Sequence, residues 1–91
     1  MDAALKYFSD GTRLFEELYQ ANPHNTNLLW GLVVSDTCLY DIYQSTGQME
    51  LAKAALIQAE QNCLQLLEVA DLPKYWRELI YIQTQKARLP D

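Results

Sequence analysis

The strongest constraint on the fold of this 91-residue chain is an apolar pattern that occurs twice. Its first copy is Ala3, Tyr7, Leu14, Leu18 and Ala21, and its second copy, 49 residues later, is Ala52, Leu56, Cys63, Leu67 and Ala70. Each copy is followed by a turn with a proline, Pro23 or Pro73, after which the spacing shortens to 47 residues, from Leu32 to Leu79. A repeat of this length indicates helix-turn-helix units, which mostly serve as binding scaffolds.

Composition and charge support a helical protein with a protein partner. Three Gly and three Pro are few for an all-β fold of many short strands, whereas the abundant Ala, Leu, Gln and Glu favour helices. Seven Lys and Arg against twelve Asp and Glu give a formal net charge of −5. Because nucleic-acid affinity comes largely from basic side chains that neutralise phosphates, no nucleic-acid partner is expected. The expected partner is another protein or a peptide.

The cysteines and the apolar segments indicate where such a chain works. Cys38 and Cys63 each fall in an apolar helical pattern without a second cysteine nearby, so we expect two buried thiols and a reducing compartment. The longest apolar stretch, residues 28–34, is far too short to cross a bilayer, and no secretory signal is recognisable. The sequence therefore predicts a soluble, cytoplasmic protein without a membrane partner.

Periodicity and turn residues predict four helices in one domain over residues 1–91. The expected helices cover about 3–21, 26–45, 48–70 and 73–89. Asn25 is a favourable N-cap, Gly47 can adopt the left-handed conformation of a C-cap, and Pro73 suits a first helical turn. Short connections favour antiparallel packing of consecutive helices.

The predicted core follows the apolar face of each helix. The third helix has the clearest seam, at Met49, Ala52, Leu56, Ala59, Cys63, Leu66 and Ala70. The second helix directs Leu28, Leu32, Leu39, Ile42 and Tyr43 to the core, and the fourth presents Trp76, Leu79, Ile80 and Ile82. In the first helix, Tyr7, Phe8, Leu14 and Phe15 stay in phase across Gly11.

These residues resemble the tetratricopeptide-repeat family. The resemblance rests on the run from Leu32 to Ser35, followed by Leu39, Asp41, Tyr43, Gly47 and Ala52. Residues 4–6, Leu18, Asn22-Pro23 and Asn25 are similar to the joint between consecutive units in the long-helix bacterial variants of that family. The chain departs from the family at Tyr40, where a small residue is usual, at Asp36, where a large apolar residue is usual, and in its longer spacing.

The resemblance implies a right-handed superhelical array and a binding face. The first helix of each unit usually lines a concave groove that holds an extended peptide or a helix, which implies a non-catalytic protein–protein interaction module. Carried over to this chain, the groove residues are Val34, Thr37, Cys38, Asp41, Gln44, Ser45, Arg77, Glu78, Tyr81 and Gln85. Asp41 and Glu78 beside Tyr81 would suit a basic or amide-rich peptide. An ordinary solvated face is the alternative explanation of the same residues.

The sequence gives little support to catalysis. His24 is the single histidine and lies between a proline and an asparagine in a turn, and no Glu-x-x-His pair, glycine-rich phosphate loop or nucleophile elbow is present. No catalytic residue, metal or cofactor is therefore expected. The competing architecture is an antiparallel four-helix bundle, as a monomer or a homodimer. In it the third helix packs against all three others, and Trp30 and Trp76 share one core. Exposed Phe8 or Trp76 would indicate self-association.

Overall fold

The computed structural model describes residues 2–89 and contains four helices. They are α1 (Asp2–Ala21), α2 (Thr26–Ser45), α3 (Met49–Val69) and α4 (Pro73–Arg88), and the described residues include no strand. The all-α class and the predicted helix boundaries are confirmed to within a residue. The side chains of Asp2, Ala4, Leu5 and Phe8 are not among those described, so the expectation for Phe8 lies outside the described part of the chain.

Local sequence signals set the ends of the helices. The Asn25 side chain accepts hydrogen bonds from the backbone amides of Asn27 at 3.0 Å and Leu28 at 3.3 Å, which caps α2 as expected. Gly47 follows α2 with a φ of +76°, a conformation that a residue with a Cβ rarely adopts. Pro73 occupies the first turn of α4, where its missing amide needs no partner.

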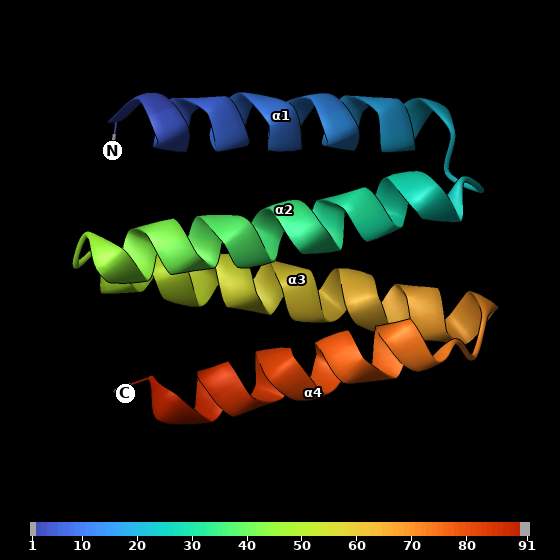
Figure 1. Ribbon diagram of the computed structural model, residues 1–91. Coiled ribbons are helices and arrows are strands. Elements are labelled where there is room, and N and C mark those ends of the chain that lie inside the picture. Colours follow the sequence, from blue (N-terminus) through green and yellow to red (C-terminus); the bar gives the residue numbers. More distant parts are fainter. Residues whose placement is uncertain (1, 90–91) are drawn as a thin grey trace.

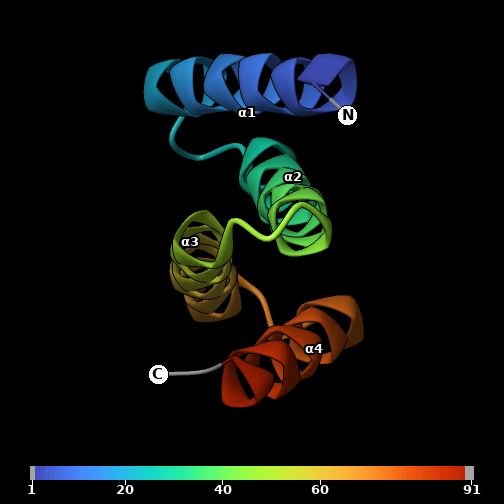
Figure 2. The same ribbon diagram turned by 90° about the vertical axis from the view of Figure 1, so that its left-hand side faces the viewer.

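The helices pack in chain order, each on the one that follows it. α1 packs on α2, α2 on α3 and α3 on α4, and the contact between α2 and α3 is the most extensive. α1 and α4 lie on opposite sides of the molecule with α2 and α3 between them (Figure 1). Seen end-on, α2 and α4 share one face and α3 lies on the other (Figure 2). Two details expected of a bundle are not observed among the described residues: α3 packs mainly against α2 and α4, and Trp76, with 48% of its surface exposed, shares no core with Trp30.

The core is centred on α2 and α3. Of the predicted α3 seam, the five central positions from Ala52 to Leu66 are buried. α2 contributes Leu32 and Leu39 as expected, together with Leu29, Val33 and Tyr40. Leu28, Ile42 and Tyr43 are only half-buried. In α4, Leu79 and Ile82 are buried with Tyr75, but Trp76 and Ile80 face solvent, which corrects their predicted core placement.

α1 buries a different face from the apolar stripe that the sequence pattern picks out. Its stripe is exposed, by 75% at Tyr7, 56% at Leu14 and 41% at Leu18, whereas Thr12 is buried. Phe15 packs against the core, and a Cβ added at Gly31 would lie 2.8 Å from its ring, so the glycine makes room for the aromatic side chain. α1 therefore contacts α2 with the face that lies one residue further along the chain than the predicted stripe. Each residue of α1 then corresponds to the α3 residue 48 positions later, instead of 49.

The fully buried Ala59 offers a test of the close approach of α3 to its neighbours. Ala59→Leu adds volume where none is available, so we expect the free energy of unfolding to fall by ~1–3 kcal/mol. Chemical denaturation measures this change. Ala54→Leu, on the exposed side of the same helix, is the matched control and should shift stability by less than ~0.5 kcal/mol. Equal stability of the two variants would contradict close packing at Ala59.

Candidate functional site on the α2–α4 face

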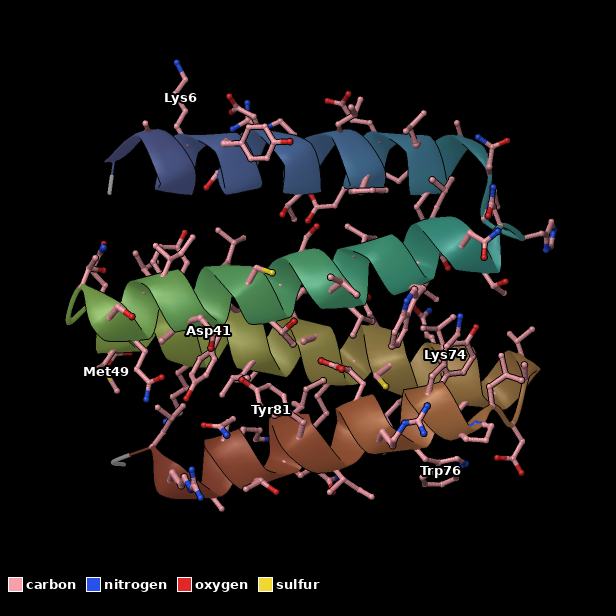
Figure 3. All side chains as sticks on the ribbon, viewed as in Figure 1. Lys6, Asp41, Met49, Lys74, Trp76 and Tyr81 are labelled. Atoms are coloured by element: carbon pink, nitrogen blue, oxygen red, sulfur yellow. The ribbon has the colours of Figure 1, made fainter. Side chains whose placement is uncertain are left out.

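α2 and α4 are joined by two side-chain hydrogen bonds. The buried Tyr40 donates its hydroxyl to Oε1 of Gln85 at 3.1 Å. Tyr81 donates its hydroxyl to Oδ1 of Asp41 at 3.4 Å, and its side chain reaches from α4 towards α2 (Figure 3). These bonds hold the two helices side by side although they are not consecutive in the chain.

Negative charge gathers at the middle of this face. Burial, followed by the negative charge of Asp41, raises the pKa of Glu78 above its ordinary value. Burial raises the pKa of the Cys38 thiol, and the carboxylates of Asp41 and Glu78 add to that shift. The pKa of Tyr81 is raised in the same way, by burial and then by Asp41. A cation bound beside Asp41 and Glu78 would offset the negative charge that disfavours ionisation of Glu78.

A cation already lies at the other end of the face. Nζ of Lys74 lies 5.2 Å from the ring centre of Trp30 and 5.6 Å from that of Tyr75. The two rings are themselves in contact, with their centres 5.3 Å apart. This arrangement fits a cation–π contact. The charge of this face thus changes along its length, from positive at Lys74 near the start of α4 to negative at Asp41 and Glu78.

The ten predicted groove residues differ in accessibility. Val34, Asp41, Gln44, Ser45, Arg77 and Tyr81 are exposed, and Cys38, Glu78 and Gln85 are half-buried. Thr37 is 8% exposed and donates its hydroxyl to the carbonyl of Val34 at 2.8 Å, so it offers little surface to a ligand. Gln85 accepts from Tyr40. The structure thus brings Cys38, Asp41, Glu78 and Tyr81 together.

Two hollows on the opposite side were not anticipated from the sequence. They lie between α1 and α3 over α2, have volumes of about 170 and 240 Å³, and share Tyr19 in their lining. Leu29 lines the first hollow and Leu32 the second, and both contain polar residues of α3. They depend on the rotation of α1, which places Tyr19 against α2, so periodicity alone could not have located them.

Asp36, where the resembling family usually has a large apolar residue, is a buried acid between three helices. It is 4% exposed, and Nδ2 of Asn62 donates to its carboxyl at 3.4 Å. Burial and the nearby Glu16 raise its pKa from 3.8 to about 7, although the bond from Asn62 opposes the shift. A carboxyl with a pKa near 7 is a functional candidate by general experience. Here its surroundings are α1, α2 and α3 side chains, and we assign it an effect on stability.

The cysteines partly match their expectation. Both are free thiols, but only Cys63 is fully buried, whereas Cys38 is half-exposed. Sγ of Cys63 donates to the carbonyl of Tyr75 at 3.2 Å, linking α3 to α4. Burial, with a smaller contribution from Glu78, raises the pKa of the Cys63 thiol to about 11. Cys63 is therefore a packing residue.

The His, Cys, Asp and Glu residues in the part of the chain that the structure describes form no group of three or more suited to a metal ion. Between residues 2 and 89, no helix combines the length and the apolar content needed to cross a membrane. Comparisons with protein-family models, with curated proteins and with solved structures find no match to this chain.

Proposed function

We propose that this chain is a non-catalytic interaction module that binds a peptide or helix of a partner protein along the α2–α4 face. The observation that carries the proposal is the pair of half-exposed to exposed carboxylates, Asp41 and Glu78, held beside Tyr81 between two helices. This cluster fits a segment with a Lys or Arg side chain. Tetratricopeptide-like membership and a cytoplasmic location are part of the same proposal and stay predictions.

Binding would combine charge with apolar contact. A single exposed charge pair contributes less than ~1 kcal/mol, so the carboxylates alone cannot hold a partner. The ring of Tyr81 and the exposed Val34 lie on the same two helices and can supply apolar area around the cation. The carboxylates would then select for a basic residue, while the aromatic and aliphatic groups contribute most of the affinity.

The raised pKa of Glu78 gives this binding a pH dependence. A group with a raised pKa becomes protonated at a higher pH than an ordinary glutamate. A basic ligand favours ionised Glu78, so its affinity is expected to fall as the pH is lowered through the titration of Glu78. A ligand bound only by apolar contacts would show no such dependence.

Selection from a library of random peptides, followed by titration calorimetry, tests the proposal. Peptides enriched on the wild-type protein should contain Lys or Arg, and Asp41→Asn with Glu78→Gln should weaken them by at least about tenfold. Glu68→Gln with Glu50→Gln removes two exposed acids of α3 as a matched control and should leave affinity unchanged. Enriched peptides that bind the double variant as well as they bind the wild type would refute the site, as would a failure to enrich any peptide.

A further inference from the structure

The outer face of α4 carries exposed apolar side chains with buried counterparts in α2. Trp76 is 48% exposed and Ile80 61% exposed. They lie 47 residues after Leu29 and Val33, which are 3% and 0% exposed. Leu29 and Val33 share a helical face with Asp36, the residue that bonds to Asn62 of α3. The outer face of α4 is thus the counterpart of the face that α2 packs against α3.

The outer face of α1 has the complementary relation to α3. The exposed Leu14 and Leu18 lie 48 residues before Asn62 and Leu66. Both of these α3 residues are buried, and Asn62 contacts α2. The stripe of α1 is therefore the counterpart of the face that α3 packs against α2.

We propose that copies of this chain associate head to tail, with α4 of one copy packed against α1 of the next. The two faces correspond to the two sides of the α2–α3 pair, which is the most extensive helix contact in the molecule. The new pair would bury Trp76 and Ile80 of one copy against Leu14 and Leu18 of the other. This inference is independent of peptide binding at the α2–α4 face.

The charges of the two helices favour this pairing. α4 has four basic side chains and one acidic one, namely Lys74, Arg77, Lys86 and Arg88 against Glu78, and it keeps a positive balance although Lys86 is already paired with Glu60 of α3 at 2.9 Å. α1 has the opposite balance, with Asp2, Asp10, Glu16 and Glu17 against Lys6 and Arg13. Opposite net charges steer two surfaces together and disfavour contacts between two copies of the same helix. An α4–α4 or α1–α1 dimer would bring like charges together.

The sizes of corresponding side chains also match. Tyr40 of α2 corresponds to Ala87 of α4, and Ala55 of α3 corresponds to Tyr7 of α1. The α2–α3 pair has the tyrosine on α2 and the alanine on α3, whereas the proposed α4–α1 pair has the alanine on α4 and the tyrosine on α1. The combined volume of the two side chains is therefore the same in both pairs. The stripe is also hollowed, by an open depression of about 450 Å³ beside Tyr7 and Leu14 that a side chain of a docked helix can enter.

The contact uses different surfaces on its two sides, so it does not close on itself by two-fold symmetry. α1 and α4 lie on opposite sides of the molecule, which leaves both ends of any assembly able to bind another copy (Figure 2). Such contacts produce open chains unless a rotation happens to close a ring. This assembly differs from the homodimer that the sequence predicts as part of the bundle alternative.

Mixing two single-ended variants tests the proposal by sedimentation and light scattering. Ile80→Glu disables the α4 face and Leu14→Glu the α1 face, and both positions are exposed enough to leave the fold intact. Wild-type protein should show an average mass that rises from micromolar to millimolar concentration without stopping at a dimer. Each variant alone should associate at least about tenfold more weakly, and a mixture of the two should form a one-to-one dimer.

Controls separate this assembly from other forms of association. Leu64→Glu, at an exposed position of α3 outside both faces, should associate like the wild type, and circular dichroism should show equal helicity for all variants. Added salt should weaken the wild-type assembly. The proposal is overturned if the wild-type protein stays monomeric throughout this range. It is also overturned if either variant alone still forms a dimer of wild-type affinity, because that dimer would be symmetric.

Discussion

Asp36→Asn is expected to raise the free energy of unfolding by up to ~4 kcal/mol at neutral to basic pH and to change it little near pH 4. In the folded protein the pKa of Asp36 is about 7, against 3.8 for an ordinary aspartate. The folded state therefore keeps a proton that the unfolded chain has released. Wild-type stability falls as the pH rises from about 4 to about 7, and the fall is complete above pH 7.

The asparagine resembles the protonated carboxyl and should remove this dependence. Denaturation in urea at about pH 4 and about pH 8 compares the two proteins, and only the wild type should lose stability between these conditions. The charged group facing Asp36 is Glu16 of α1, and Asn62 of α3 donates to it. Asp10→Asn, at an exposed position, is the control. If Asp36→Asn and the wild type lose the same stability with pH, Asp36 is not the buried acid described above.

Tyr40→Ala is expected to destabilise the protein by ~3–5 kcal/mol, because it empties the volume of a fully buried aromatic side chain. Tyr40→Phe keeps the ring and removes only the hydroxyl that bonds to Gln85, so it should cost about 1 kcal/mol. This comparison separates ring packing from the α2–α4 hydrogen bond. Tyr40 shares the buried core with Ala52, Ala55 and Ala59 of α3, whose small side chains leave volume for an aromatic ring.

Chemical denaturation of the three proteins gives these values, and hydrogen exchange gives the location of the effect. Amides of α4 should exchange faster in Tyr40→Ala than in Tyr40→Phe, since the ring supports the contact between α2 and α4. A stability for Tyr40→Ala close to that of Tyr40→Phe would mean that the ring contributes little. Tyr40 would then be a tolerated departure from the family pattern rather than a structural element.

Local signals in the sequence determined the helices. The capping side chain of Asn25, the left-handed Gly47 and the proline at the start of α4 act within a turn of their own positions, so their effect is visible without the rest of the fold. The apolar seam of α3 was also visible in the sequence, because its apolar residues form one unambiguous stripe. That stripe agrees with the position of α3 between α2 and α4.

Tertiary structure decided which side of the outer helices is buried. α1 has Leu14 and Phe15 at adjacent positions, and the repeated pattern in the sequence included Leu14. The space left by Gly31 selects Phe15, which turns Leu14 to solvent. Likewise, α4 presents Tyr75 to the core and Trp76 to solvent.

The candidate site shows the same division. The sequence supplied Asp41 and Glu78 as acids on two helices, but residues 37 positions apart come together only when α3 carries α4 back beside α2. The buried state of Asp36, and with it a pKa near 7, depends on helices α1 and α3 that approach α2 from different sides. Helix formation is a property of neighbouring residues, whereas burial and electrostatics depend on contacts between residues far apart in the chain.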